Sequence, residues 1–527
     1  MKTKVILTAI FLAGFLLPGG AQTLTKTGVV KIKLRNTGSI IQDTQVKGYY
    51  YFYDLEKKDR KNVHYLLSLY DENLRPIHEV DIVRPKTYIL VEGVYNGSAF
   101  GFLFYDTRSN EIELIAYDRT LKQAGTVKKK IANKNALAIY GIVAQGNDAS
   151  QALLVGVPDK GFVHYGFTED KKSHFDLSFY DNTMKKVWSS SAQQDAMKYE
   201  MAMEAFQDEL YMGSLIMKKK NTTTKDIEFD LTVQQVTDGK TLFRVPMVTA
   251  KYSIMLADVY YNKAEQNFVV FGECYDIGDK ELKSQSLGFI TVVLDMNGKI
   301  VTEKVSTWET EISRVAPVNE KGKFDGSNTN ILFHDIIRTA DGQIFAVGEQ
   351  YKKVVSAAGV ASQVLAGLGA AGGMNAYSNI STMQLNVYNM VIFEFNPDYS
   401  LKKVHVFEKD KNQVLLPAGS GYTSSKMLSY YAKAIGGFDF TFSQLARDKN
   451  TFVVTYINYD REKGQKSKNV LSSVVYTPEK TFSVDRLDLN RKSSDYYVHQ
   501  GKEGYVLVTE YYKKDKKLES RLEKINY

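Results

Sequence analysis

The sequence predicts an all-β protein, a single β-propeller made of four-stranded antiparallel blades. Two observations lead to this fold class: alternating strands and tight turns recur along the chain, and no helical periodicity separates them. Successive turns are mostly about 45–65 residues apart, a period typical of propellers and solenoids. A parallel α/β sheet does not fit, because each of its crossovers needs about a dozen residues or more, usually in a helix.

The stretch 174–188, HFDLSFYDNTMKKVW, shows the recurring pattern. Phe175, Leu177 and Phe179 occupy alternate positions, which lie on one face of an extended strand. Asp181 then opens a turn, a position that aspartate suits because its side chain caps the nearby backbone. The same strand and turn occur in YLLSLYDENLRPI, IELIAYDRTLKQA, FITVVLDMNGKIV and MVIFEFNPDYSLKKV.

A further strand precedes each of these, as in FGFLFYD, FVVFGECYD and FVVTYINYD. A polar loop, often rich in lysine, joins this strand to the one that follows it. A turn connects each of these two strands to one further strand, so the unit has four. Four antiparallel strands in each unit define a propeller blade. Both faces of these strands carry aromatic residues, and a single blade buries too little surface to be stable alone. We therefore expect the blades to pack face to face.

Eight of these second strands occur, but only seven marked turns follow a third strand. The last unit ends after its third strand, and the strand-like TGVVKIKLR, Thr27–Arg35, lies near the N-terminus. We predict eight blades, with seven as the alternative. We also predict that Thr27–Arg35 is the outer strand of the last blade and closes the ring, which hides the sheet edges.

The first 21 residues have the features of a signal peptide. Lys2 and Lys4 precede the apolar run Val5–Leu17, and the small residues Gly19 and Ala21 suit cleavage after Ala21. The run is shorter than the roughly 20 apolar residues of a membrane-spanning helix, and no cysteine follows it for a lipid anchor. We expect residues 1–21 to be removed and residues 22–527 to form the propeller, without a transmembrane segment, in the periplasm or outside the cell.

The cysteine content argues against disulfide bonds, and the net charge argues against a nucleic-acid partner. Cys274 is the only cysteine, so we expect no internal disulfide and a buried, unreactive thiol. The formal net charge is +8, and removing the leader with its two lysines and no acid leaves +6. For a chain of this length, that excess indicates an acidic partner only weakly, and a nucleic acid is not expected.

Two stretches carry a resemblance to a known group of proteins. DIIRTADGQIFAVGEQY (Asp335–Tyr351) and VVLDMNGKIVTEK (Val292–Lys304) resemble the bacterial propeller repeat in which a strand ends in Thr-x-Asp-Gly and restarts with an apolar run. The whole chain resembles exported, uncharacterised propeller-like proteins of Gram-negative bacteria. This resemblance implies a fold and no established activity.

Long connections point to one functional face. In a propeller, the connection between the second and third strands and the passage to the next blade open on the same face. In this chain both kinds are long, including the between-blade stretches 306–330 and 408–437, whereas the opposite face has short turns. Because function tends to lie on elaborated loops over a rigid scaffold, we expect any ligand or partner on the long-connection face.

The largest insertion, Lys352–Asn386, is rich in alanine and glycine and lies within one blade. Val360–Leu368 is expected to form a short helix in it, either as a lid over the propeller or as a flap that docks a partner or lipid. Lysine-rich hairpins form a predicted basic rim, which would either receive an anionic glycan or lipid headgroup or protect the strand edges. Its members are Lys57, Lys58, Lys171, Lys172, Lys218–Lys220, Lys466, Lys468, Lys513, Lys514, Lys516 and Lys517.

Enzyme motifs are missing from the sequence. No G-x-S-x-G elbow occurs, and the seven histidines form no H-x-H or H-E-x-x-H pattern. His334 could contact a metal at the start of an inner strand, but a structural role is the simpler interpretation. We therefore predict no catalytic residue, no metal and no cofactor.

The sequence is best interpreted as a non-catalytic exported scaffold, monomeric, that binds a protein or glycan partner through its long-connection face. The candidate contact residues are Trp308, Arg314, Tyr422, Tyr430 and Tyr431, because exposed aromatic and arginine side chains dominate recognition. A polysaccharide hydrolase or lyase is one alternative, and it needs carboxylates, or a histidine and a tyrosine, that converge at the central channel. A structural component of the cell envelope is the other.

Overall fold

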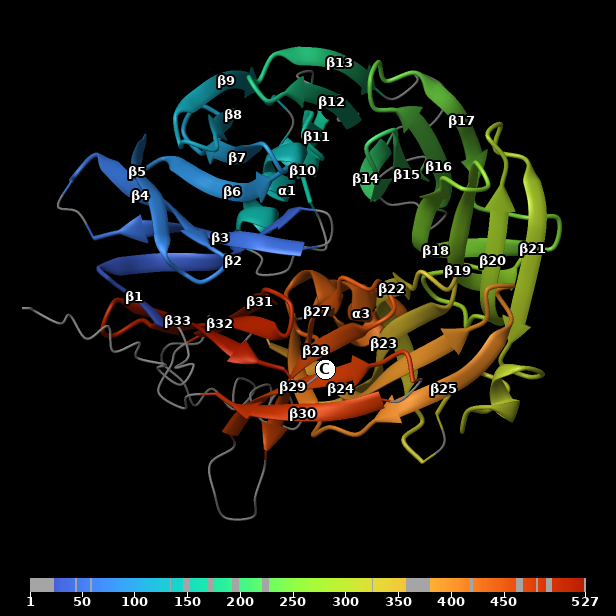
Figure 1. Cartoon of the computed structure of the whole chain (residues 1–527). Helices are drawn as coiled ribbons and strands as arrows, with labels where there is room; N and C mark the ends of the chain where they lie inside the picture. The colour runs from blue at the N-terminus through green and yellow to red at the C-terminus, as the bar shows by residue number, and fades with distance from the viewer. Residues whose placement is uncertain are drawn as a thin grey trace, which may run out of the picture.

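Eight antiparallel sheets stand around a central axis in the computed structural model of the chain (Figure 1). The all-β propeller and its eight blades are confirmed, and the seven-bladed alternative is wrong. The structure describes residues 23–42, 45–56, 59–132, 134–145, 152–168, 175–191, 199–219, 227–324, 326–356, 380–417, 420–460, 468–479, 482–489 and 495–525.

The first four blades follow one another in chain order. Blade 1 contains β2 (Val29–Gln42), β3 (Gln45–Leu55), β4 (Asn62–Asp71) and β5 (Pro76–Pro85), and blade 2 contains β6 (Tyr88–Tyr95), β7 (Ala99–Asp106), β8 (Glu111–Asp118) and β9 (Gln123–Lys130). Blade 3 contains β10 (Leu154–Val157), β11 (Gly161–Phe167), β12 (Phe175–Asp181) and β13 (Lys186–Ser191), and blade 4 contains β14 (Tyr199–Gln207), β15 (Tyr211–Lys219), β16 (Glu228–Gln235) and β17 (Thr241–Pro246).

The last four blades continue the ring, and blade 6 has an additional strand, β26, beside β24. Blade 5 contains β18 (Tyr252–Asn262), β19 (Asn267–Asp276), β20 (Gly288–Leu294) and β21 (Ile300–Thr307), and blade 6 contains β22 (Asn330–Arg338), β23 (Ile344–Val355), β24 (Ile380–Phe395), β25 (Leu401–Phe407) and β26 (Asn412–Pro417). Blade 7 contains β27 (Phe440–Leu445), β28 (Phe452–Asp460), β29 (Lys468–Tyr476) and β30 (Phe482–Asp488), and blade 8 contains β31 (Asp495–Gln500), β32 (Tyr505–Tyr512), β33 (Lys517–Lys524) and β1 (Thr23–Thr27).

The two ends of the chain meet in blade 8. β1 pairs antiparallel with β33, with Thr25 opposite Glu519, so an N-terminal strand closes the ring as expected. The predicted segment, Thr27–Arg35, is wrong by one strand: β2 begins at Val29 and is the inner strand of blade 1. Gly28, with a φ of +76°, lies where the chain passes from one sheet to the other. Apolar and polar residues alternate through both strands, so the sequence pattern alone does not show where the chain changes from one sheet to the other.

Side chains bury both faces of each blade against its neighbours. The Phe52 and Phe102 rings stack with centroids 4.4 Å apart between blades 1 and 2, and the Phe289 and Phe393 rings meet edge to face at 5.0 Å between blades 5 and 6. Every residue of β7 and β20 is buried. This two-sided burial explains why aromatic residues occur on both faces of the strands.

The seam between blades 8 and 1 is packed like the other blade interfaces. Val29, Tyr53 and Leu518 belong to one buried cluster that spans both blades. The hydroxyl of Tyr511 on β32 donates to the carbonyl oxygen of Val30 at 2.6 Å, and that of Tyr497 donates to the carbonyl oxygen of Ile32 at 3.0 Å. The chain ends are therefore held by apolar contacts and polar contacts together.

The inner strands share a local irregularity. The register of the first strand against the second shifts at an equivalent place in blades 2, 4, 5, 6 and 7, between Leu90 and Glu92, Glu204 and Phe206, Leu256 and Asp258, Phe333 and Asp335, and Phe440 and Phe442. Such bulges bend a strand and increase its twist. The bulges lie on the strands nearest the axis (Figure 1).

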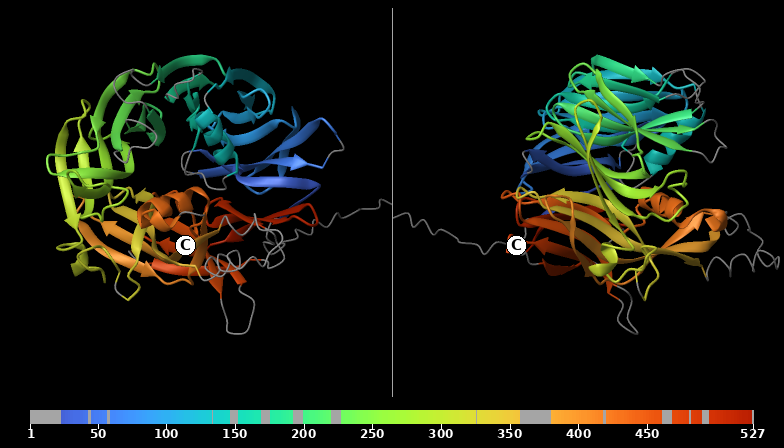
Figure 2. Two further views of the ribbon diagram at one scale, coloured as in Figure 1. Left: turned by 180° about the vertical axis from the view of Figure 1, so that it is seen from behind. Right: turned by 90° about the vertical axis from the view of Figure 1, so that its right-hand side faces the viewer.

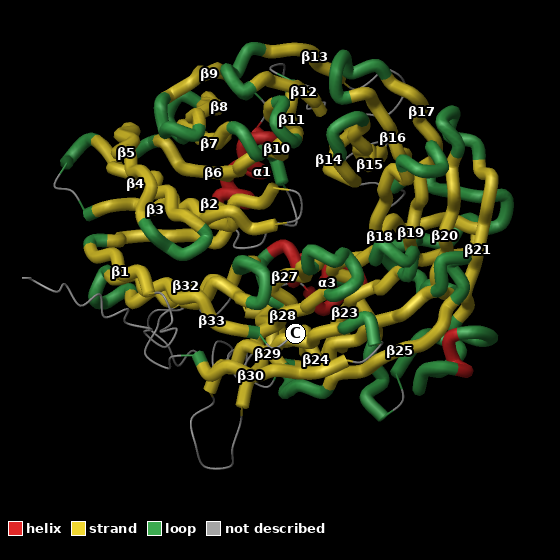
Figure 3. Tube along the Cα trace, in the orientation of Figure 1, coloured by secondary structure: helices red, strands yellow, loops and turns green. Residues whose placement is uncertain are grey.

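Helices occur only in the connections between blades, among the described residues. α1 (Lys134–Gln145) follows blade 2, η1 (Ile312–Arg314) follows blade 5, and η2 (Ser420–Tyr422) and α3 (Ser425–Ala434) follow blade 6 (Figure 3). α1 and α3 lie on the same face of the ring, toward the viewer in the view from behind (Figure 2, left). This is the long-connection face. The sequence predicted these long connections but neither of the two α-helices.

Some predicted features lie outside the described residues. These are the leader 1–21, the helix Val360–Leu368 and the rim residues Lys57, Lys58, Lys171, Lys172, Lys220 and Lys466. The ends of the predicted insertion are described, and they are strand: Val354 of β23 pairs with Gln384 of β24. Cys274 is buried, as expected.

His164 on β11 is a buried titratable group. Its Nε2 lies 3.2 Å from the hydroxyl of Tyr140 on α1, and its Nδ1 has no hydrogen-bond partner among the described residues. Burial, with a smaller contribution from Lys129, lowers the pKa of His164 to about 3. The ring fits closely against Gly166, where an added Cβ would lie 2.2 Å from the imidazole.

We predict that deleting residues 23–27 together with the leader destabilises the propeller. Five residue pairs between β1 and β33 are lost, which costs about 3–8 kcal/mol at about one backbone hydrogen bond for each pair and about 0.5–1.5 kcal/mol net for each bond. The exposed edge of β33 should also promote self-association. Urea unfolding and size-exclusion chromatography compare this chain with one that begins at Gln22; equal stability of the two would contradict the closure.

We predict that His164 makes the fold sensitive to acid. Its pKa falls from about 6.5 in the unfolded chain to about 3 in the fold, so the unfolded state alone binds the proton as pH falls from 6.5 toward 3, and stability is lost over that window. Between pH 7 and pH 5 the loss is about 2 kcal/mol. Urea unfolding of His164→Gln should show that much less pH dependence; His78→Gln, at an exposed histidine, is the control. An unchanged pH dependence in His164→Gln would contradict the assignment.

Candidate functional site

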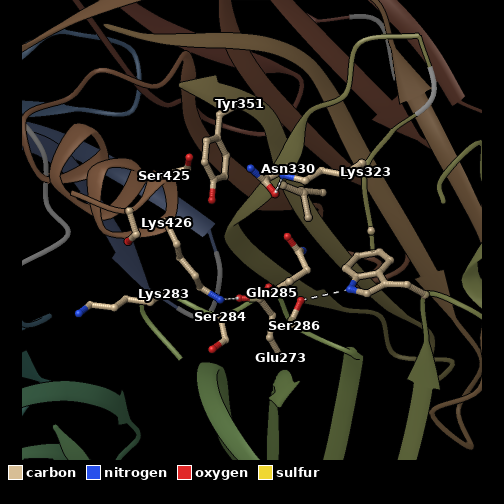
Figure 4. A pocket seen from close by; sticks show the side chains of 14 residues that line it. Glu273, Lys283, Ser284, Gln285, Ser286, Lys323, Asn330, Tyr351, Ser425 and Lys426 are labelled. Carbon is tan, nitrogen blue, oxygen red and sulfur yellow. Dashed lines mark hydrogen bonds and ion pairs between the residues drawn. The ribbon is translucent and has the colours of Figure 1, made fainter. Parts of the chain in front are cut away.

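A solvent-open pocket of about 230 Å³ lies between blades 5 and 6 on the long-connection face (Figure 4). The two between-blade stretches singled out in the sequence, 306–330 and 408–437, both contribute to it, together with the β19–β20 connection. The lining residues are mostly polar: Glu273, Lys283, Ser284, Gln285, Ser286, Trp308, Gly322, Lys323, Asn330, Ile331, Tyr351, Ser424, Ser425 and Lys426.

Trp308 forms an apolar wall of the pocket. Its side chain is only 1% exposed, and its indole nitrogen donates to the hydroxyl of Ser286 at 3.1 Å. Gly322, with a φ of +64°, lies against the ring, and an added Cβ would come within 2.5 Å of the indole. The connection after β21 therefore folds back over the tryptophan and carries Lys323 to the pocket.

α3 reaches the pocket through its N-terminus. Ser424 caps the helix by accepting from the backbone N–H of Met427 at 3.1 Å, and its hydroxyl donates to the carbonyl oxygen of Leu282 in the β19–β20 connection. In the first turn of the helix, Lys426 forms an ion pair with Glu273 and lies 4.5 Å from the ring centre of Tyr275. The helix of the blade 6–7 connection is thereby attached to blade 5.

Two tyrosines lie beside this ion pair. The hydroxyl of Tyr351 points toward the same space as the side chains of Asn330 and Ser425 (Figure 4). Burial is the main cause that raises the pKa of Tyr351, and the negative charge of Glu273 adds to it. The pKa of Tyr430 is raised for the same two reasons, again with burial first. Tyr351 thus stays protonated, and its hydroxyl also forms a hydrogen bond with the side chain of Ser429.

The predicted contact residues all lie on this face, but in different environments. Trp308 lines the pocket from a buried position, so the expectation that it is exposed is wrong. Arg314 in η1 and Tyr422 in η2 are exposed, and Tyr431 on α3 is 41% exposed. Tyr430 is half-buried and packs against the cluster under α3. Of the five, only Trp308 lines the pocket directly.

The sequence analysis missed most of the lining residues. Glu273, Asn330 and Tyr351 come from three strands, and Lys426 comes from a helix, so no short motif joins them. One local signal was available for α3. Ser424 precedes apolar residues at helical spacing, Leu428 and Ala432, which is the pattern of a helix N-terminus.

A buried charge network fixes the two ends of the connection that carries α3. Lys409 Nζ lies 3.2 Å from Glu349 Oε1 and also pairs with Asp439, and all three side chains are inaccessible or nearly so. Glu349 Oε2 accepts from the backbone N–H groups of Asp439 and Phe440 at 3.0 and 2.9 Å. His334 Nε2 lies 3.1 Å from the same oxygen, which places His334 in a structural network, as the sequence analysis preferred.

Burial and the charge of Lys409 are the main influences on the pKa values of the two carboxylates in this network. Burial works to raise the pKa of Glu349, but the charges of Lys409 and His334 hold it below its ordinary value. Burial raises the pKa of Asp439 in spite of Lys409. Lys409 and Glu349 thus form the principal ion pair at neutral pH, where removing the lysine leaves a buried negative charge.

Carboxylates on the inner strands near the axis lie in different surroundings. On β14, protein atoms close to the Glu204 carboxyl raise its pKa by desolvation, although the residue as a whole is exposed. On β18, Asp258 pairs with Arg338 of the next blade. The described part of the chain contains no group of three or more histidine, cysteine, aspartate or glutamate side chains that could hold a metal ion.

These observations define the protein as an eight-bladed β-propeller with a polar pocket on its long-connection face. It belongs to DUF6770, a family of unknown function that matches residues 1–526. No curated protein sequence is detectably similar to the chain. Within the described residues, none of the helices has the length and apolar character needed to cross a membrane.

Several solved structures match the chain at very low sequence identity and low TM-scores. The β-propeller domain of the trilobed protease from Pyrococcus furiosus is 8% identical, with a TM-score of 0.34 over 86% of this chain and 96% of that one. A quinohemoprotein alcohol dehydrogenase from Pseudomonas putida HK5 is 9% identical, with a TM-score of 0.41 over 94% of this chain and 77% of that one. Levansucrase from Bacillus subtilis is 12% identical, with a TM-score of 0.28 over 60% of this chain and 80% of that one.

We predict that Lys409→Met costs about 3–5 kcal/mol of unfolding free energy, because Glu349 remains buried without its cation. Denaturant unfolding at neutral pH measures this loss. In the Lys409→Met, Glu349→Gln double variant, the cost should be smaller than in the single variant, since no uncompensated charge remains at Glu349. Equal stability of Lys409→Met and the unmodified chain would show that the network does not hold the connection.

Proposed function

We propose that this chain is a non-catalytic binding scaffold that holds a glycan in the pocket between blades 5 and 6. The observation that carries the proposal is the composition of the pocket: hydroxyl and amide groups from several connections converge on it over a tryptophan wall. Sugars present many hydroxyl groups that donate and accept at once, and Ser284, Gln285, Asn330, Tyr351 and Ser425 can do the same.

The size and surroundings of the pocket favour a glycan over a folded protein. At about 230 Å³ it is smaller than the about 300–1,000 Å³ that is usual for drug-sized ligands, and it suits a single sugar unit of a longer chain. Two exposed aromatic rings, Tyr422 and Tyr431, stand on the same connection as Ser425 and offer flat surfaces to further sugar units. A protein partner is the main alternative occupant of this face.

Binding without catalysis fits the charges in the pocket. The usual hydrolysis of a glycosidic bond needs two carboxylates on either side of it. Among the described lining residues, Glu273 is the single carboxylate, and Lys426 pairs with it. No observation of comparable weight supports a hydrolase or lyase. None supports a role as a structural envelope component either.

The proposal places the protein outside the cytoplasm, where cell-surface and environmental glycans occur. The basis for this is the predicted leader, residues 1–21, with its basic start and short apolar run. N-terminal sequencing of the secreted chain tests the location, and Gln22 is the first residue expected.

The test of the function is a glycan array probed with the chain from Gln22 onward, followed by calorimetry on the best ligand. Gln285→Ala and Ser425→Ala should each weaken binding about tenfold, the effect of about 1.4 kcal/mol for a lost hydrogen bond. Ser483→Ala, at an exposed serine on blade 7, is the matched control and should bind normally. Failure to bind any glycan, or normal binding by both pocket variants, would overturn the proposal.

A further inference from the structure

The pocket between blades 5 and 6 has an excess of positive charge. Lys426 is compensated by Glu273, and Lys283 extends away from the other lining side chains (Figure 4). Lys323 remains, and a second cation, Lys352, lies close enough to repel it. Among the described residues, no carboxylate forms an ion pair with either of these two lysines.

The partners of these lysines are neutral oxygens. Lys323 Nζ donates to the side-chain oxygen of Asn330, and Lys352 Nζ donates to the carbonyl oxygen of Ser327 at 3.0 Å. Burial, and then the charge of Lys352, lower the pKa of Lys323. No described carboxylate offsets the charge of this half-buried ammonium group beside a second cation, and an anion in the pocket would do so.

Groups next to Lys323 can donate hydrogen bonds to the remaining oxygens of an oxyanion. Because the oxygen of Asn330 accepts from Lys323, its amide nitrogen is left as a donor, and in Figure 4 this nitrogen faces the side of Tyr351. The hydroxyl of Tyr351 and that of Ser425 border the same space. A cation with amide and hydroxyl donors around it is the set that binds carboxylate, sulfate or phosphate oxygens.

We propose that the glycan is anionic and that Lys323, with Asn330, binds its oxyanion group. This inference rests on the proposed function, since it specifies the class of glycan that the same pocket accepts. The group is a carboxylate, sulfate or phosphate carried by a sugar. The lysine acts by charge and not only by shape, so an uncharged analogue of the same sugar lacks the main interaction.

The experiment compares matched charged and uncharged ligands on the same chain. Calorimetry at low salt measures binding of oligogalacturonates and of their fully methyl-esterified forms, of sulfated and desulfated heparin oligosaccharides, and of phosphorylated and dephosphorylated mannose oligosaccharides. At least one charged member should bind about tenfold or more tightly than its uncharged partner, and the pair that shows the difference identifies the anion. The preference should weaken as salt is raised to 0.5 M.

Substitutions test whether Lys323 provides the charge. Lys323→Met should remove the preference for the charged member, because it weakens binding of that member more than binding of the uncharged one, and Lys323→Arg should restore part of the preference. Lys283→Met, which removes a lysine whose side chain extends away from the other lining side chains, is the matched control and should keep this preference. Circular dichroism and thermal unfolding confirm that each variant is folded.

The outcomes separate this inference from the function on which it rests. Equal binding of charged and uncharged members, or an unchanged preference in folded Lys323→Met, overturns the anionic ligand and leaves the glycan scaffold in place. Absence of binding to every saccharide overturns both. A preference that depends on Lys323 supports both.

Discussion

Two-sided burial of the blades is the constraint on which the rest of this structure depends. Each sheet has apolar side chains on both faces, as in β7 and β20, where every residue is buried. A blade alone would expose one or both of these faces to water, so a blade is stable only between two neighbours. In a row of blades the first and last would still lack a neighbour, and closing the ring removes that cost. The pairing of β1 with β33 and the packing of Val29 beneath Tyr511 close it.

A rigid ring determines where a site can form. Turns on one face are short, whereas the connections on the other face are long enough to fold over the blade ends. Two of these connections meet above blades 5 and 6, and each is fastened to the strands beneath it. Trp308 anchors the first connection through Ser286, and the network of Lys409, Glu349 and Asp439 anchors the second. The pocket between them is thus built by segments whose positions are set by buried contacts.

The sequence predicted what depends on local pattern. Alternation in strands such as Phe175–Asp181 and the aspartate turns after them indicated blades, and their recurrence indicated eight. The closing strand was predicted as Thr27–Arg35, one strand too late, because two successive strands share one alternating pattern and only Gly28 separates them. α1 and α3 were missed, since short helices in long connections carry little periodicity.

The candidate site could be predicted only as a face and not as a set of residues. Stretches 306–330 and 408–437 were correctly placed on one side, but Glu273, Lys323, Tyr351 and Lys426 come from four separate segments and meet only because blades 5 and 6 and their connections pack together. Trp308 was chosen as an exposed aromatic and is instead a buried wall, because Gly322 folds the chain over it. Burial of this kind depends on tertiary contacts, which no local pattern reveals.

The most direct measurement of the central claim is an engineered cross-link at the seam. Thr25 and Glu519 are opposite each other in the β1–β33 pair, and directly opposed residues of antiparallel strands lie within the Cα separation that a disulfide requires. Cys274 is buried and does not compete. If the two chain ends close the ring, the Thr25→Cys, Glu519→Cys variant forms an intramolecular disulfide under mild oxidation, and the oxidised chain resists urea better than the reduced one. A variant that stays reduced while folded, or links only to other copies of itself, would contradict the closed ring.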